Sequence, residues 1–186
     1  MAIANGLLRG KRVALLAVNG AHEHEFWTPY YRLKEEEAAV IVAGMERGAQ
    51  YYGEGRHGLD GLKLAPTDAA IGELNPAELD GLIIPGGIYG PLALRVHPPT
   101  LELVRQLNTR RKVLAAICHG PWVLISAGVL RGRKAVCPDD MAVDLQNAGA
   151  ELGRQEAVRD GHIITAVYFG YLPQFLKLVI QALAGN

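Results

Sequence analysis

Short apolar runs alternate along this chain with longer segments in which apolar residues recur every three or four positions. Continuous apolar runs of this length are typical of strands buried on both faces of a parallel sheet, whereas the longer period indicates helices. The runs predict strands at 13–18, 39–44, 81–84 and 112–118, and the periodic segments predict helices at 25–37, 99–109, 121–127, 139–148 and 171–184. The segment "RDGHIITAV" reads as a turn that enters a further strand.

This alternation of strand and helix covers nearly the whole chain. It predicts an α/β fold with a mostly parallel, doubly wound sheet and helices on both faces. At 186 residues, of which 49% are hydrophobic, the chain is long enough for one substantial core. We therefore expect a single domain over residues 1–186.

One stretch, residues 45–66, breaks the alternation with many glycines and two adjacent tyrosines. It predicts an irregular loop or a short hairpin. Its "GEGRHG" resembles a phosphate-binding loop, but no buried strand precedes it and no clear helix follows. Turn glycines explain the stretch better.

Charge and cysteine content narrow the choice of partners and compartment. Nineteen basic and nineteen acidic residues cancel, so the chain lacks the positive field that draws proteins to nucleic acid or anionic membranes. Two cysteines are too few for a disulfide framework, which favours a reducing compartment. The first apolar run is too short to span a membrane, and no small-residue cleavage site follows it. We expect a cytoplasmic protein that binds neither nucleic acid nor membranes.

Cys118 ends a predicted strand and stands just before a predicted helix that has Pro121 near its start. Active groups of parallel sheets gather beyond the carboxyl ends of the strands, and a helix start favours thiolate over thiol. A nucleophile on a sharp turn between strand and helix is the nucleophile-elbow arrangement. Local sequence alone leaves open that Cys118 is an ordinary buried thiol.

Four residues near Cys118 are further candidates for the site. Adjacent side chains diverge at a turn, so the ring of His119 need not touch the sulfur, and a structural role for this ring is plausible. The His119 backbone N–H is better placed, together with an N–H from Gly86 or Gly87, to stabilise an oxyanion beside Cys118. The two glycines equally fit a tight turn after a strand. Gly120 completes the Cys-His-Gly turn and is included with the substrate-binding glycines.

Glu25 follows the first predicted strand and should lie at the same sheet edge. Taken alone it reads as a carboxylate at a helix start. Near a thiolate in a desolvated site it would be protonated and would donate a hydrogen bond to the sulfur. The stretch "AHEHEF" also suggests a metal site at His22 and His24, but Glu25 has the better role beside Cys118, and we expect no metal or other cofactor. His22 and His24 then belong to a pocket edge or an interface.

Together, "AICHGPWVLISAGVLRGRK", the upstream "LIIPGG" and "EFWTPYYRLKEEEA" resemble the ThiJ/PfpI superfamily of intracellular proteases, deglycases and stress proteins. The resemblance runs from about Val13 to Leu183. It implies a flavodoxin-like three-layer α/β sandwich and a homodimer or larger assembly. It also implies that Cys118 is the reactive nucleophile, His119 its neighbour and Glu25 the acid that contacts the thiol.

The chain departs from this family pattern in three places. PfpI-type peptidases have an acidic residue shortly after the "PGG" turn, which completes a Cys-His-acid triad, but no Asp or Glu lies between Gly87 and Glu102 here. The hydroxyl and tyrosine residues that commonly follow "GRK" are replaced by "AVCPDD" with Cys137, and the late arginine is missing from "ITAVYFGYLP". The missing acid counts against peptidase activity, while the other two changes make the pocket less polar.

Three functions fit these residues. In a deglycase-like or glyoxalase-like hydrolase, Cys118 would add to the carbonyl or hemiaminal carbon of a methylglyoxal adduct, and His119 or Glu25 would move the proton. In a peptidase, Cys118 would attack an amide. In an oxidative-stress sensor, Cys118 would be oxidised to a sulfenic or sulfinic acid. The first is favoured, with a small carbonyl compound as substrate, because it needs no distant acid.

Overall fold

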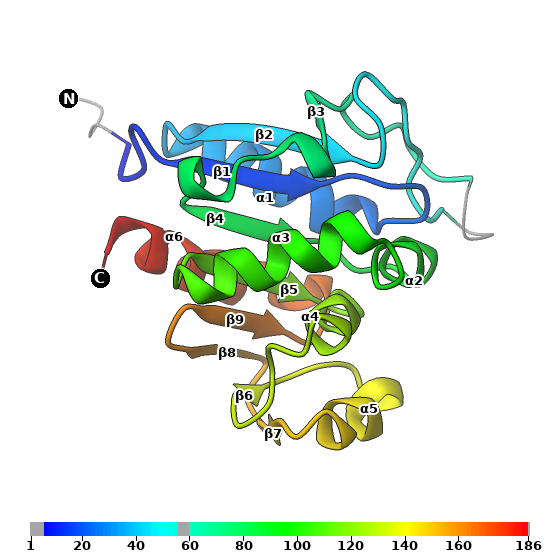
Figure 1. Ribbon diagram of the computed structural model, residues 1–186, viewed down its shortest axis with the longest axis vertical. Helices are drawn as coiled ribbons and strands as arrows, with labels where there is room; N and C mark the ends of the chain where they lie inside the picture. The colour runs from blue at the N-terminus through cyan, green and yellow to red at the C-terminus, as the bar shows by residue number, and fades with distance from the viewer. Residues whose placement is uncertain (1–5, 56–59, 186) are drawn as a thin grey trace.

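The computed structural model describes residues 6–55 and 60–185, and within them seven strands form one sheet in the order β3-β2-β1-β4-β5-β9-β8 (Figure 1). All neighbouring pairs are parallel except β8 and β9. The predicted mostly parallel α/β sheet is confirmed. Its strands are β1 (Arg12–Leu16), β2 (Ala39–Gly44), β3 (Ala69–Ala70), β4 (Gly81–Ile84), β5 (Val113–Ile117), β8 (Ala157–Asp160) and β9 (Ile163–Ala166).

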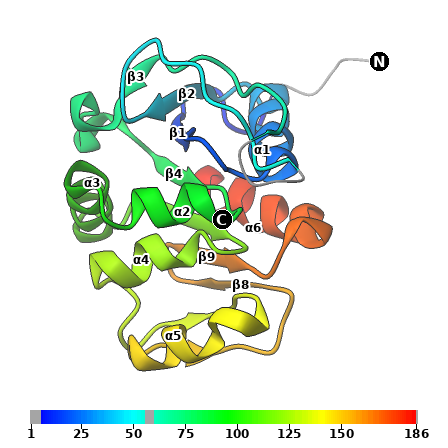
Figure 2. The same ribbon diagram turned by 90° about the vertical axis from the view of Figure 1, so that its right-hand side faces the viewer.

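Helices cover both faces of the sheet (Figure 2). On one face lie α1 and α6, whose Phe26 and Phe175 pack with Leu15 and Ile83 of the strands. The side chains that alternate with these strand residues point to the other face and pack against α3 and α4. The helices are α1 (Glu23–Glu35), α2 (Tyr89–Leu94), α3 (Pro98–Thr109), α4 (Pro121–Ala127), α5 (Ala142–Asn147) and α6 (Leu172–Ala184). The result is the expected flavodoxin-like three-layer sandwich.

Several predicted boundaries shift by a few residues. The first strand begins and ends earlier than the apolar run, and α1 covers 23–35 rather than 25–37. The predicted helix at 139–148 is a 3₁₀ turn, Asp139–Met141, followed by α5. The turn in "RDGHIITAV" joins two antiparallel strands, because the polar "AVRD" of β8 forms an edge strand that an apolar pattern does not reveal.

Smaller elements were also absent from the sequence prediction. They include α2 and a second, two-stranded sheet of β6 (Lys134–Ala135) and β7 (Glu151–Leu152). The predicted loop at 45–66 has isolated bridges from Gly53 to Ala21 and from Tyr52 to Lys63. Residues 56–59, which include the last three letters of "GEGRHG", lie outside the described residues. In the described ranges, no helix is both long and apolar enough to cross a membrane.

Candidate active site

The loops that follow β1, β4 and β5 meet at the carboxyl edge of the sheet, where ligands bind in open α/β folds. β1 is followed by Glu25 in the first turn of α1, β4 by Gly86 and Gly87, and β5 by Cys118. Cys118 has a φ of 60° in the left-handed region, which is unfavourable for a residue with a side chain. This is the sharp strand-to-helix turn that the sequence predicts.

Glu25 is fully buried beside the cysteine. Its Oε2 accepts a hydrogen bond of 2.8 Å from the Gly86 N–H, and its carboxyl group is within hydrogen-bonding reach of the Cys118 thiol. Burial raises the pKa of Glu25 to about 8, so the group is mainly protonated at neutral pH. A Cβ atom at Gly86 would lie 2.4 Å from Cys118 Cβ and 2.6 Å from Glu25 Oε2, so only glycine allows this approach.

The His119 ring contacts the Cys118 sulfur, contrary to the expectation that the two side chains diverge. Its Nδ1 lies 3.3 Å from Sγ, because the left-handed turn at Cys118 abolishes the alternation of side chains that a strand would impose. On its other side, Nε2 lies 3.1 and 3.0 Å from the two carboxylate oxygens of Asp140. With the Nε2 proton directed to Asp140, Nδ1 is left as the acceptor for the thiol proton.

Asp140 is the acid that the sequence comparison did not find. It lies in the 3₁₀ turn Asp139–Met141, within "AVCPDD", and not after the "PGG" turn where the family has its acidic residue. The site therefore contains a Cys-His-Asp array within one chain. Trp122 stabilises it: its ring packs 4.7 Å from the His119 ring, and its Nε1 donates to Asp144 at 2.9 Å.

Two backbone N–H groups lie close enough to the cysteine sulfur to lower the pKa of the thiol, those of Gly87 and His119. They are the pair expected to stabilise an oxyanion. The N–H of Gly86 donates to Glu25 and that of Gly120 donates to the Ile117 carbonyl at 2.9 Å, so neither amide faces the reacting atoms. Gly86 is required for space, and a Cβ at Gly120 would lie 2.6 Å from the Ile84 carbonyl oxygen.

The Cys118 thiol is harder to ionise than the helix start alone predicts. Burial raises its pKa to about 12, the charge of an ionised Glu25 raises it as well, and the N–H groups of Gly87 and His119 only partly oppose them. Burial thus opposes the stabilisation of the thiolate that the helix start provides, and a base that takes the thiol proton favours reaction.

Glu54 is a second acidic residue that the sequence prediction missed. It belongs to the glycine-rich stretch, where its Oε1 accepts from the Ile88 N–H at 3.4 Å. Burial raises its pKa, and the neighbouring His119 opposes that shift. The acid is thus close to the catalytic candidates, but its glycine-rich surroundings resemble an ordinary turn in the sequence.

His22 and His24 lie at the start of α1, with ring centroids 5.6 Å apart. Within residues 6–55 and 60–185, no three His, Cys, Asp or Glu side chains are grouped so that they could hold a metal ion. Instead both rings contact Phe169, and His22 stacks on it at 4.8 Å.

Replacing Glu25 should shift the ionisation of Cys118 to lower pH. As pH rises through about 8 in the wild type, Glu25 loses its proton first, and its charge then opposes formation of the thiolate. In Glu25→Gln no such charge forms, so the pH profile of Cys118 alkylation should move down by about one unit or more. Glu25→Leu should shift it less, because leucine cannot donate a hydrogen bond to the sulfur. The exposed Glu35→Gln is the control, and unchanged profiles in both Glu25 variants would disprove the contact.

Comparison with known proteins gives a consistent result. The model of the DJ-1/PfpI family matches residues 11–182. Deglycase PfpI of Pyrococcus furiosus is 36% identical over 172 residues, covering 90% of this chain and 99% of its own. Protein/nucleic acid deglycase 2 of Escherichia coli is 33% identical over 93% of this chain and 98% of its own. The crystal structure of Drosophila melanogaster DJ-1beta superposes with a TM-score of 0.83 and 25% identity, covering 95% of this chain and 91% of that one.

Proposed function

Because this chain belongs to the DJ-1/PfpI family, we propose that it is a stress-related, cysteine-dependent deglycase that acts on glyoxal or methylglyoxal adducts. One observation carries the proposal: the Cys118 sulfur lies between two groups that can move protons, His119 Nδ1 at 3.3 Å and the buried Glu25. Conversion of a methylglyoxal adduct to lactate requires several proton transfers at neighbouring atoms. This pair supplies them without a metal or an external oxidant.

The first step forms a carbon–sulfur bond in place of the carbon–nitrogen bond. The hemiaminal carbon of the adduct is already tetrahedral, so its carbon–nitrogen bond breaks first: His119 takes the hydroxyl proton and gives it to the departing amine, which leaves an aldehyde. His119 then takes the thiol proton while Sγ attacks the aldehyde carbon, and Asp140 stabilises the imidazolium that results. The N–H groups of Gly87 and His119 stabilise the negative charge that develops on the aldehyde oxygen, and the imidazolium returns its proton to that oxygen to complete a hemithioacetal.

The second step is an internal redox reaction. Glu25 moves a proton from the sulfur-bearing carbon to the adjacent carbonyl carbon, through an enediol whose oxygen-bound proton is redistributed. The first carbon is thereby oxidised to a thioester and the second is reduced to an alcohol. Water hydrolyses the thioester, which releases lactate and restores the thiol. A protonated Glu25 at neutral pH is suited to this exchange, since both its forms are accessible below and above a pKa of about 8.

A peptidase is the second candidate, and Asp140 favours it. The array of Cys118, His119 and Asp140 supplies the orienting acid that the "PGG" turn lacks. The missing acid after "PGG" therefore no longer counts strongly against amide hydrolysis. Glu25, however, has no necessary part in amide hydrolysis. An oxidation sensor is less favoured, because peroxide reacts with thiolate and burial raises the pKa of Cys118 to about 12.

Substrate assays with the wild-type protein separate these functions. Incubation with methylglyoxal adducts of N-acetylcysteine and N-acetyl-lysine should release the free amino acid derivatives and lactate, which NMR detects. Fluorogenic peptides should remain intact over the same period. Cleavage of peptides with no lactate formed would favour the peptidase. Selective oxidation of Cys118 by peroxide, with neither substrate consumed, would favour the sensor and overturn the deglycase.

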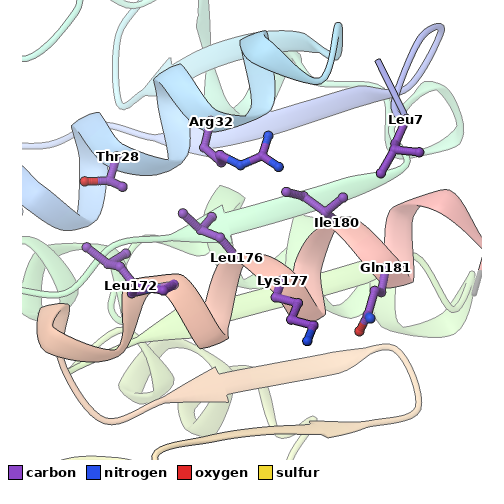
Figure 3. A pocket seen from close by; sticks show the side chains of 9 residues that line it. Leu7, Thr28, Arg32, Leu172, Leu176, Lys177, Ile180 and Gln181 are labelled. Carbon is purple, nitrogen blue, oxygen red and sulfur yellow. The ribbon is translucent and has the colours of Figure 1, made fainter. Parts of the chain in front are cut away.

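The proposed enzyme acts in the cytoplasm as a homodimer or larger assembly. The two cysteines are free thiols, which suits a reducing compartment. A groove of about 560 Å³ between α1 and α6 supports self-association: Leu172, Leu176 and Ile180 form its apolar floor, and Arg32 and Lys177 stand at its sides (Figure 3).

A further inference from the structure

Aromatic rings gather where α1 begins and where the chain leaves β9. The His22 ring stacks on Phe169 with centroids 4.8 Å apart and planes 15° apart, and Tyr168 meets Phe169 edge to face at 5.2 Å. We call His22, Tyr168 and Phe169 the aromatic wall. Two of its members lie in "ITAVYFGYLP", the segment in which the family arginine is missing.

The aromatic wall is joined to the candidate active site through the backbone. The Phe169 backbone N–H lies close enough to the buried Glu25 carboxyl group to lower its pKa, and the His22 N–H donates to the Gly86 carbonyl at 3.0 Å. The segment before the wall is fixed to the nucleophile as well, because the Cys118 N–H donates to the Ala166 carbonyl at 2.9 Å. The wall therefore borders the site on the side of Glu25.

Much of the wall faces solvent, although its rings are large and apolar. Phe169 is 45% exposed and Tyr168 is 41% exposed. Burial lowers the pKa of His22, so its ring is mainly neutral at neutral pH and stacks as an uncharged aromatic group. Exposed aromatic surface beside a reactive group is well suited to contact a ligand.

The other described side of the site is polar and acidic. It contains His119 with Asp140, and Glu54 lies close enough to Cys118 to influence its pKa. Carboxylates near the sulfur disfavour an anionic substrate by repulsion. A substrate that suits both sides has a reactive carbonyl toward the polar side and a neutral, flat apolar group toward the wall.

We infer that the aromatic wall makes this enzyme selective for neutral dicarbonyl compounds, or their adducts, that carry an aryl or similarly flat apolar group in place of the methyl group of methylglyoxal. This inference rests on the proposed function, because it names the substrate class of the same site. Phe169 is the specificity-determining residue, since its ring is the one that both His22 and Tyr168 contact.

Turnover of two substrates tests this selectivity. The wild type should have a kcat/KM for phenylglyoxal at least about tenfold above that for methylglyoxal, and Phe169→Ala should lower this ratio by about five- to tenfold. The Phe169 contact with Glu25 is made by the backbone, so the substitution keeps it. Tyr31→Ala removes an exposed aromatic ring on the outer side of α1 and should leave the ratio unchanged. An equal ratio in wild type and Phe169→Ala would overturn the inference.

Alkylation of Cys118 tests the wall without any turnover. The rates of modification by N-benzyl iodoacetamide and by iodoacetamide are compared by mass spectrometry of the Cys118 peptide, with N-acetylcysteine as the reference thiol. For the wild type, the rate with the benzyl reagent divided by the rate with iodoacetamide should exceed the same ratio for N-acetylcysteine. This ratio should fall in Phe169→Ala but not in Tyr31→Ala. If this preference is found while no dicarbonyl compound or adduct is turned over, the proposed deglycase function is wrong, but the aromatic wall still binds flat apolar groups. If the ratio is the same in wild type and Phe169→Ala, the inference that the aromatic wall contacts the ligand is wrong.

Discussion

Cys118→Ala should lower kcat/KM for methylglyoxal adducts by at least about 10³-fold, because removal of a nucleophile abolishes the covalent route. Nothing else in the described site can replace the sulfur: Glu25 and His119 act on protons, and Asp140 contacts only the far nitrogen of the His119 ring. Cys118→Ser should be nearly as inactive, since a hydroxyl group is a weaker nucleophile than a thiol. The measurement is the rate of lactate formation from the adducts.

Cys137 provides the matched control for this experiment. It is also a free thiol, buried where Cys118 is half-buried, and burial likewise raises its pKa to about 12. Its φ is not in the left-handed region, and it lies among acidic residues beyond α4. Cys137→Ala should keep activity within about twofold of the wild type. Full activity of Cys118→Ala would show that Cys118 is not the nucleophile. Equal losses of activity in Cys118→Ala and Cys137→Ala would indicate a general loss of structure.

The fold was predictable because its central elements are marked by local patterns. Strand β2 and helix α4 occupy the predicted residues, 39–44 and 121–127. A strand buried on both faces needs an unbroken apolar run, and Pro121 suits the first turn of a helix. The edge strand β8 and the short helix α2 carry no such mark: β8 reads "AVRD", and α2 contains Gly90 and Pro91.

The candidate site was predictable only in part. Cys118, Gly87 and Glu25 lie at the ends of strands or starts of helices, where topology alone brings side chains to one edge of the sheet. Asp140 reaches His119 from a 3₁₀ turn 21 residues away, and no spacing rule marks this contact. The thiol pKa depends on packing in three dimensions, and burial, which the sequence does not show, raises this pKa against the effect of the helix start.

The contact between Asp140 and the His119 ring makes Asp140 the positioning residue of the site. Asp140→Asn should therefore lower kcat by about ten- to a hundredfold with little change in KM. The carboxylate accepts the His119 Nε2 proton at 3.0 Å and stabilises the imidazolium that forms when Nδ1 takes the thiol proton. We expect a loss smaller than that for a buried triad aspartate, because the Asp140 side chain is 64% exposed and water screens its charge.

A variant of the neighbouring Asp139 distinguishes the positioning of His119 by Asp140 from a general effect of negative charge. Asp139→Asn removes a charge of the same sign one residue away. In the described structure no contact joins the Asp139 side chain to His119, so the kcat of this variant should stay close to that of the wild type. Asp140→Glu should recover part of the lost rate, because a carboxylate on an exposed, flexible side chain can still accept the Nε2 proton. Equal kcat values in Asp140→Asn and Asp139→Asn would show that His119 acts without an oriented acid, and the Cys-His-Asp array would then be structural rather than catalytic.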